Sequence, residues 1–232
     1  MTGTEILGQA RKTLVEGTAF YWTDAELLIH LNLGIKDLWR AISDNFQDYF
    51  FAVSEAVTFV ANASTLTGVP TNVAKVLSIE PVDQESYPSL KFFPRAYNSP
   101  DAQTARAQAA SDPSQLGPVY YSLTGAGAPV GAPTVYAAPK TSATISLRVA
   151  YTPTTPTIVA ADNNPVPGES DDALIAWTIA HALAREREDR KPDPDWLAKY
   201  STEKTNILTF LSPRQNDEPD VVEGVHEPWI NG

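Results

Sequence analysis

The sequence predicts an α+β protein in which a helical bundle carries an inserted, small antiparallel β-sandwich or barrel. Residues 23–44 have the apolar spacing of a long amphipathic helix, the next hundred residues contain short strand-like runs, and two more helical patterns close the chain. In the predicted bundle, the long N-terminal helix packs on a C-terminal antiparallel helical hairpin.

These patterns also predict the domain boundaries. We expect a helical domain from residues 1–46 and 156–212, with a β-domain at 47–155 inserted between its two parts. Residues 213–232 are expected to form an extended C-terminal arm, because they hold three prolines and no helical stripe. With 232 residues, of which 43% are hydrophobic, the chain has enough apolar material for a core.

Two helices are expected at the N-terminus. Residues 4–16 form a short one, which Gly17 ends. Thr23 can cap the long helix, and Glu26 can reach back to complete a capping box. At 1.5 Å per residue, residues 23–44 span about 33 Å. The apolar stripe of this helix consists of Leu28, Leu31, Ile35, Leu38 and Ile42.

The inserted region alternates strand-like runs with turn signals. β-branched and aromatic residues predict strands at 49–53, 56–60, 73–79, 90–93, 119–123, 134–138 and 144–151. Ser99 and Pro100 begin a surface helix that ends near Ala110. The glycine-rich segment 125–131 is expected to be a hairpin loop, since its glycine offsets do not match a phosphate-binding loop and a strand follows it.

The chain then returns to helix through residues 152–170, which contain four prolines. Ser170 or Asp171 is expected to cap a buried, alanine-rich helix over residues 172–190. Asp193 followed by Pro194 begins the last helix. The core side of this last helix consists of Trp196, Leu197, Tyr200, Ile207, Leu208 and Leu211.

Charge and composition exclude several classes of function. The chain has 28 acidic and 17 basic side chains, a net charge of −11, so nonspecific attraction to nucleic-acid phosphates is not expected. There is no cysteine, which excludes disulfides and thiolate metal sites. The sequence has neither an apolar run of 18 residues nor a signal-peptide pattern. We therefore expect a soluble, unexported protein without a membrane role.

Catalytic and metal-binding patterns are also absent. None of the histidines at 30, 181 and 226 has a second histidine three or four residues away, as a zinc-type pair on one helix requires. Glu186, Glu188 and Asp189 alternate with basic residues, which favours an exposed, ion-paired helix end over an acid–base pair. The sequence predicts no enzyme, no cofactor and no metal.

The order of elements and one short motif resemble the head-to-tail adaptor (connector) proteins of tailed bacteriophages. The resemblance covers most of residues 4–212 and departs at 94–118 and in the arm. A looser match follows the β-domain, in Tyr151-Thr-Pro153 and in the alanine-rich helix up to Arg185. The motif at the start of the long helix consists of Trp22, Asp24, Glu26, Leu27, Leu31 and Asn32.

This resemblance implies a structural virion protein. Similar proteins form a ring, usually twelve-fold, beneath the portal of a filled capsid. The ring connects the capsid to a downstream tail or nozzle protein and lets DNA pass, without specific binding, during ejection. The implied location is the neck or tail of the virion, after synthesis in the host cytoplasm.

Two sets of candidate interaction residues follow. In the arm, Val221, Val222, Trp229 and Ile230 are expected to dock onto the portal or another partner, because Trp is enriched in interface hot spots. The alternative is an arm that folds back on its own domain. Residues 156–212 hold ten acids and six bases, so Glu186, Glu188 and Asp189 are also candidates for an acidic channel face.

A function from another class stays open at this stage. The β-domain could be a binding module of a tail accessory or fibre protein that recognises a carbohydrate or a protein receptor. Such a module needs an exposed aromatic platform, for which Tyr97, Tyr120 and Tyr121 are the candidates.

Overall fold

The structure is a computed structural model that describes residues 1–15, 21–46, 49–125 and 133–212. The chain divides into two compact units, Met1–Phe46 with Pro156–Gly232, and Gln47–Thr155. We call them the helical unit and the β unit. The described residues form an α+β protein with five α-helices, so the predicted class is confirmed.

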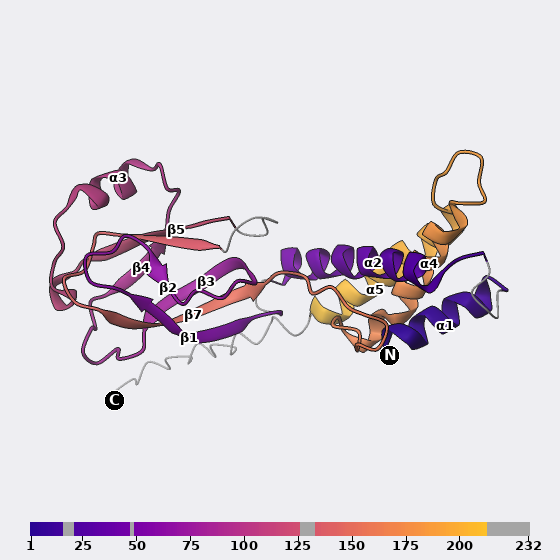
Figure 1. Ribbon diagram of the computed structural model, residues 1–232, viewed down its shortest axis with the longest axis horizontal. Helices are drawn as coiled ribbons and strands as arrows, with labels where there is room; N and C mark the ends of the chain where they lie inside the picture. The colour runs from indigo at the N-terminus through magenta and orange to yellow at the C-terminus, as the bar shows by residue number, and fades with distance from the viewer. Residues whose placement is uncertain (16–20, 47–48, 126–132, 213–232) are drawn as a thin grey trace, which may run out of the picture. The chain divides into compact units, whose positions relative to one another are not determined.

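Four of the helices belong to the helical unit (Figure 1). They are α1 (Gly3–Thr13), α2 (Asp24–Asn45), α4 (Asp171–Leu183) and α5 (Pro194–Leu211), and a short 3-10 turn, η2 (Gly168–Ser170), precedes α4. Helix α4 packs against the other three. The small residues of α4 are buried around nearly its whole circumference, as expected for a helix that is apolar on all faces.

Helix α2 supplies most of the large, fully buried side chains of this core. Leu31, Ile35, Leu38 and Ile42 from the predicted stripe are buried, together with Leu27, whereas Leu28 is half-buried. Gly34 lets α4 approach closely, since a Cβ at this position would lie 2.8 Å from the Trp177 ring. On α5, the buried residues are Tyr200, Ile207 and Leu211.

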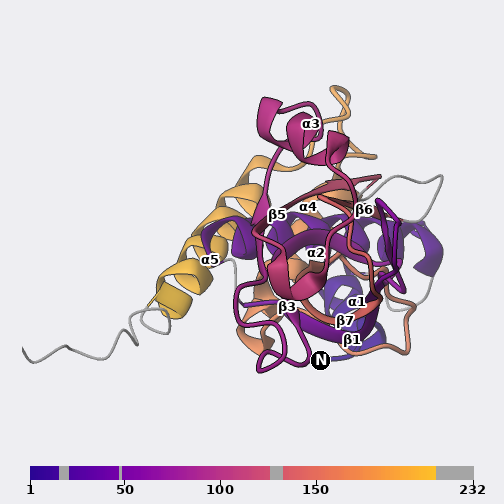
Figure 2. The same ribbon diagram turned by 90° about the vertical axis from the view of Figure 1, so that its left-hand side faces the viewer.

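The described residues of the β unit form two sheets and one α-helix, which Figure 2 shows from another side. The four-stranded sheet has the order β2-β1-β7-β3, and the three-stranded sheet has the order β4-β5-β6. Helix α3 (Pro100–Ala107) contacts β5, and a 3-10 turn, η1 (Pro113–Gln115), follows α3. The strands are β1 (Ala52–Phe59), β2 (Leu66–Thr67), β3 (Val73–Pro81), β4 (Lys91–Pro94), β5 (Pro118–Thr124), β6 (Thr134–Ala138) and β7 (Ile145–Pro153).

Buried residues from both sheets form one hydrophobic cluster, in which Val57, Val73, Val119, Val135 and Leu147 are fully enclosed. Strand β7 provides it with Ile145, Leu147, Val149 and Tyr151, the alternating residues that the sequence placed on one buried face. The core of the β unit is therefore built mainly by strand periodicity.

Two predictions about the strands and their pairing were wrong, and one strand was missed. The runs at 49–53 and 56–60 both contribute to one strand, β1, which has an irregularity in its register between Ser54 and Val57. Strand β2 was not predicted, because two residues carry no periodicity. Strands β4 and β5 pair in parallel, since the chain crosses through α3 before it returns.

The predicted end of α4 was also wrong, because the helix stops at Leu183 and not at Arg190. A continuing helix would need the carbonyl oxygens of Ala180 and Ala182 as acceptors. The backbone N–H of Asp193 donates to the first at 2.9 Å, and the Trp22 indole N–H donates to the second at 3.0 Å. The Ala182 carbonyl also accepts from the Arg185 N–H at 3.1 Å, in a turn tighter than an α-helix, so local turns and groups distant in sequence end the helix together. Over the part of the chain that is described, no helix is both long and apolar enough to cross a membrane.

Candidate functional site

The start of α2 has the predicted capping box. The Thr23 hydroxyl accepts a hydrogen bond from the Glu26 backbone N–H at 3.2 Å, and the Glu26 carboxylate accepts one from the Thr23 N–H at 2.9 Å. The hydrogen bonds that the Glu26 carboxylate accepts from the Thr23 backbone and from the Thr23 hydroxyl lower the pKa of Glu26, and Arg185 adds to that effect. Glu26 is thus held as a carboxylate, and in that form it completes the cap at the start of α2.

Trp22 and Arg11 connect this start to two other helices. The Trp22 indole, buried to 5% exposure, donates to the Ala182 carbonyl at the end of α4. The Arg11 guanidinium, on α1, donates to the Trp22 carbonyl at 2.7 Å and to Asp24 at 2.6 Å. Trp22 and Asp24, at the start of α2, therefore contact both the last turn of α1 and the last turn of α4.

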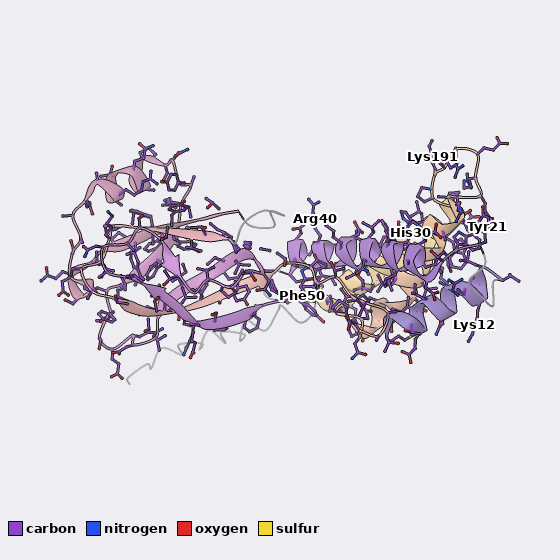
Figure 3. The ribbon with its side chains drawn as sticks, in the orientation of Figure 1. Lys12, Tyr21, His30, Arg40, Phe50 and Lys191 are labelled. Carbon is purple, nitrogen blue, oxygen red and sulfur yellow. The ribbon has the colours of Figure 1, made fainter. Side chains whose placement is uncertain are left out.

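Arg185 adds a contact from beyond the end of α4. Its guanidinium donates to the Tyr21 carbonyl at 2.9 Å, pairs with Glu26 at 3.3 Å and lies 4.7 Å from the centre of the Tyr21 ring. Tyr21 is labelled in Figure 3, at the end of the helical unit where α1, α2 and α4 meet. The ion pair is exposed, so its main effect is on geometry and it adds little stability.

Asn32 connects α2 to the returning chain. Its side-chain amide accepts from the Ile158 N–H at 2.9 Å and donates to the Ile158 carbonyl at 3.1 Å. Leu27 and Leu31, the remaining motif residues, are fully buried. Each residue of the motif that carries the adaptor resemblance therefore holds chain segments together.

Two histidines on different helices meet in this unit, which the sequence spacing did not reveal. The rings of His30 on α2 and His181 on α4 lie 5.8 Å apart, and His181 stacks on Trp177 at 4.1 Å. His181 Nδ1 donates to the Trp177 carbonyl at 2.9 Å. Burial lowers the pKa of His30, His181 lowers it further, and Glu26 partly opposes both. His30 is labelled in Figure 3.

A second polar cluster, also not foreseen, joins α2 to α5. The Asp37 carboxylate accepts hydrogen bonds from the Tyr200 hydroxyl and from Lys204, the latter at 2.6 Å. Partial burial raises the pKa of Asp37, but the bonds from Lys204 and Tyr200 outweigh it, so the pKa is lower than usual. Burial and the neighbouring Asp37 raise the pKa of Tyr200. Tyr200 stays protonated and donates.

The three acidic candidates lie in the loop after α4. Glu186, Glu188 and Asp189 are exposed, and Lys191, labelled in Figure 3, belongs to the same loop. Hydrogen bonds from the Lys191 N–H and from Arg187 lower the pKa of Asp189. Residues 185–191 contain three acids and four bases, so the loop itself is not acidic. Among the residues described, no three His, Asp or Glu side chains are placed to hold a metal ion.

The three aromatic candidates of the β unit differ in exposure. Tyr121 is buried to 6% exposure and Tyr120 is half-buried, whereas Tyr97 is 40% exposed. Tyr97 packs edge-on against Tyr136 at 4.9 Å and lies under the Arg106 guanidinium at 3.9 Å. Of the three candidates, Tyr97 alone presents an exposed ring. The predicted docking residues Val221, Val222, Trp229 and Ile230 lie outside the described residues.

Comparison with known proteins agrees with the motif. No curated protein matches the chain. The model of one family, described as SU10 adaptor protein, matches residues 1–221, which includes both units. This is a family of phage head-to-tail adaptors, so the resemblance predicted from the sequence is confirmed, and a phage structural role without catalysis fits it. The chain belongs to the SU10 adaptor protein family.

Proposed function

We propose that this protein forms a ring beneath the portal of a tailed phage, joins the capsid to a downstream tail or nozzle protein, and lets DNA pass through its centre. The family match over residues 1–221 carries this proposal. An adaptor role in general brings interaction with portal and tail proteins, oligomerisation and a virion location. Beyond this general role, we propose the position of the ring, its twelve-fold order and the passage of DNA through it during ejection.

The charge of the chain supports a DNA conduit. A basic channel would bind the phosphates that must slide through it, whereas an acidic one does not hold them. Residues 156–212 have ten acids and six bases, a net of −4 (6 − 10), while the β insert has seven acids and six bases, a net of −1 (6 − 7). We therefore propose that the helical unit lines the channel and that the β unit faces outward or toward the tail. Glu186, Glu188 and Asp189 are proposed to lie on the channel face, where the net acidity comes from the rest of residues 156–212, because their own loop has three acids and four bases.

The arm is the proposed docking element. Trp229 and Ile230 near its end are proposed to insert into the portal, with Val221 and Val222 as further docking residues. Large apolar side chains in a segment with five acids and one base are typical of an interface that forms only with a partner. Removing residues 213–232 should therefore abolish stable complexes with the portal; complexes of unchanged stability would exclude this role of the arm.

Sedimentation and negative-stain imaging of the purified full-length protein, alone and with its portal, test the proposal. We expect closed rings coaxial with the portal, whether they form in solution or only on contact with it. If the protein stays a monomer and does not co-sediment with the portal, the adaptor-ring function is wrong.

A further inference from the structure

The facing histidines of α2 and α4 have no role in the family motif or in the proposed ring. The rings of His30 and His181 lie 5.8 Å apart between centres and are tilted by 34°, and both residues are half-buried. The sequence has no zinc-type pair on one helix, but the packing of α2 on α4 brings together one histidine from each helix. Imidazole is a good ligand for several transition metals, so this pair is a candidate metal site.

His181 is held in a form that suits coordination. Its Nδ1 donates to the Trp177 carbonyl at 2.9 Å, and its ring stacks on the Trp177 ring with 4.1 Å between centres. Because Nδ1 carries the proton, Nε2 of the neutral ring has a lone pair to offer. Histidines that bind metals nearly always donate their other ring N–H in this way, often to a backbone carbonyl. His181 therefore has a fixed ring orientation and the tautomer of a metal ligand.

His30, by contrast, is not anchored. Within the described residues its Nδ1 is buried without a hydrogen-bond partner. A buried polar atom in this state calls for a partner outside the protein chain, such as a water or an ion. Burial and the neighbouring His181 lower the pKa of His30, so its ring is mainly neutral at pH 7 and keeps a lone pair for a metal ion.

The separation of the two rings fits one ion that is shared by both. With metal–nitrogen bonds of about 2.1 Å, two imidazoles on one tetrahedral ion have their ring centres about 5 Å apart. The observed 5.8 Å is slightly longer. A small rotation of the unanchored His30 ring closes this difference, and the anchored His181 ring need not move.

The charges beside the pair are balanced. Glu26 lies one turn before His30 and acts on it electrostatically. Glu26 in turn pairs with Arg185, so these two groups together add no net charge. Since no third His, Asp or Glu completes a ligand set among the described residues, water would fill the other positions of the ion. Two imidazoles and water suit Zn²⁺, Ni²⁺ or Cu²⁺, whereas Mg²⁺ and Ca²⁺ prefer oxygen ligands.

We propose that His30 and His181 together bind one divalent transition-metal ion of the Zn²⁺, Ni²⁺ or Cu²⁺ type, and that this ion joins α2 to α4. The ion stabilises the folded helical unit, because the unfolded chain does not hold the two imidazoles side by side. Both ligands must be unprotonated, so the ion is released at acidic pH. This site does not depend on the proposed ring or on the arm.

Titration of the full-length protein with ZnCl₂ tests the site, because the chain has only three histidines and no cysteine. Calorimetry compares the natural protein with His30→Gln, His181→Gln and the control His226→Gln, which removes the histidine outside the pair. We expect one Zn²⁺ per chain in the natural protein and in the control. Each of the other two variants should bind at least about tenfold more weakly, since even the outer-shell partners of a metal ligand are worth about 10- to 100-fold in affinity.

Thermal unfolding measures whether the ion joins the two helices. At a free Zn²⁺ concentration about 100 times the Kd, the unfolding equilibrium constant should fall about 100-fold, and EDTA should reverse the effect. Hydrogen exchange should show added protection in α2 and α4 but not in β7. His30→Gln and His181→Gln should unfold cooperatively without Zn²⁺, as the natural protein does, and should not respond when it is added.

Three results would overturn the proposal. Zn²⁺ could leave the Tm of the natural protein unchanged or bind only at millimolar concentration, as an adventitious ion does. His226→Gln could lose the response while His30→Gln and His181→Gln keep it. Mg²⁺ at the same concentration could raise the Tm equally, which would show a general effect of divalent cations on a chain with a net charge of −11.

Discussion

The two units are held together in different ways. In the helical unit, side chains far apart in sequence make specific polar contacts, such as Trp22 with Ala182, Asn32 with Ile158 and Asp37 with Lys204. In the β unit, one apolar cluster and the strand ladders provide most of the cohesion. Of its long-range side-chain pairs, Arg148 with Glu55 is exposed and Tyr151 with Asn72 is part-buried.

This difference explains where the recognisable motif lies. Alternating apolar residues can build the β unit in many sequences, so its residues are replaceable if the pattern is kept. The contacts at the start of α2 need particular donors and acceptors, because a lost partner leaves a buried group without a hydrogen bond. The helical unit therefore contains the short specific motif, whereas the β unit is defined by its alternating apolar residues.

The largest expected effect is that of Trp22→Ala, which removes a buried ring and the hydrogen bond to the end of α4. We expect the helical unit to lose about 3–5 kcal/mol of stability. Trp22→Phe, which keeps most of the ring, should lose about 0.5–1.5 kcal/mol for the missing hydrogen bond, since the Ala182 carbonyl still accepts from the Arg185 N–H. Hydrogen exchange resolved by segment measures both losses.

A substitution in the β unit provides the comparison for this hydrogen-exchange experiment. Phe59→Ala in the β unit, where the side chain is fully buried, should cost about 3–5 kcal/mol in that unit. Trp22→Ala should reduce amide protection in α1, α2 and α4 while β7 keeps its protection, and Phe59→Ala should do the reverse. If either substitution lowers protection equally in both units, the units do not have separate cores.

Gly34→Ala tests the close approach of α2 and α4. The added Cβ would lie 2.8 Å from Trp177 Cδ1, so overpacking should cost about 1–3 kcal/mol, partly offset by the better helix propensity of Ala. Gly8→Ala on α1 is the matched control, since nothing lies within 4 Å of its added Cβ. Thermal unfolding should show a lower Tm for Gly34→Ala and an unchanged or higher Tm for Gly8→Ala. Equal shifts in the two variants would contradict the packing argument.

A smaller effect is expected from the helix caps. Thr23→Ala should destabilise the helical unit by about 1 kcal/mol, because it removes the acceptor for the Glu26 N–H. Ser99→Ala removes the corresponding cap of α3, where Ala102 donates at 3.3 Å. Because α3 is a short helix at the surface of the β unit, this loss should matter less for cooperative unfolding. Denaturant titration followed by circular dichroism compares the two variants, and a larger loss from Ser99→Ala would be evidence against this ranking.

The smallest expected effect is a pH dependence that originates in His30. Burial and His181 lower its pKa in the folded state, so the unfolded chain binds a proton at a higher pH than the folded chain does. The stability from neutral His30 is thus complete above its unfolded pKa of about 6.5 and declines as the pH falls through that value toward the folded pKa.

Other charged or titratable groups lie near His30, so the measurement needs a control variant that lacks this histidine alone. His181 faces it from α4, and Glu26, which pairs with Arg185, lies one turn before it on α2. Tm measured between pH 7.5 and 5.5 should fall more steeply for the natural protein than for His30→Gln. Parallel profiles would show that His30 does not contribute. The lowered pKa of Asp37 acts in a separate window, below about pH 4, where its protonation removes stability.

Local features were predictable from the sequence. The capping box at Thr23, the Ser99 cap of α3 and the Asp193 cap of α5 all occur as predicted, because each depends on residues within three positions. The buried face of β7 followed from alternation for the same reason.

Features set by distant residues were not predictable. The end of α4 involves Trp22 and Asp193, whose N–H groups donate to carbonyl oxygens in its last turn. The local sequence contains no sign of these contacts, so the charged run up to Arg190 was predicted to be helical. The parallel pairing of β4 with β5 depends on the crossover through α3, which leaves no trace in strand periodicity. His30 and His181 are 151 residues apart, and only the packing of α2 on α4 brings them together.

The central claim is that the helical unit forms the wall of a DNA channel while the β unit faces outward or toward the tail. An electron cryomicroscopy map of the full-length protein bound to its portal tests it most directly. We predict that α2, α4 and α5 surround the central axis and that the sheets lie away from it. A ring with the helices on its outside and the strands at the axis would contradict the account.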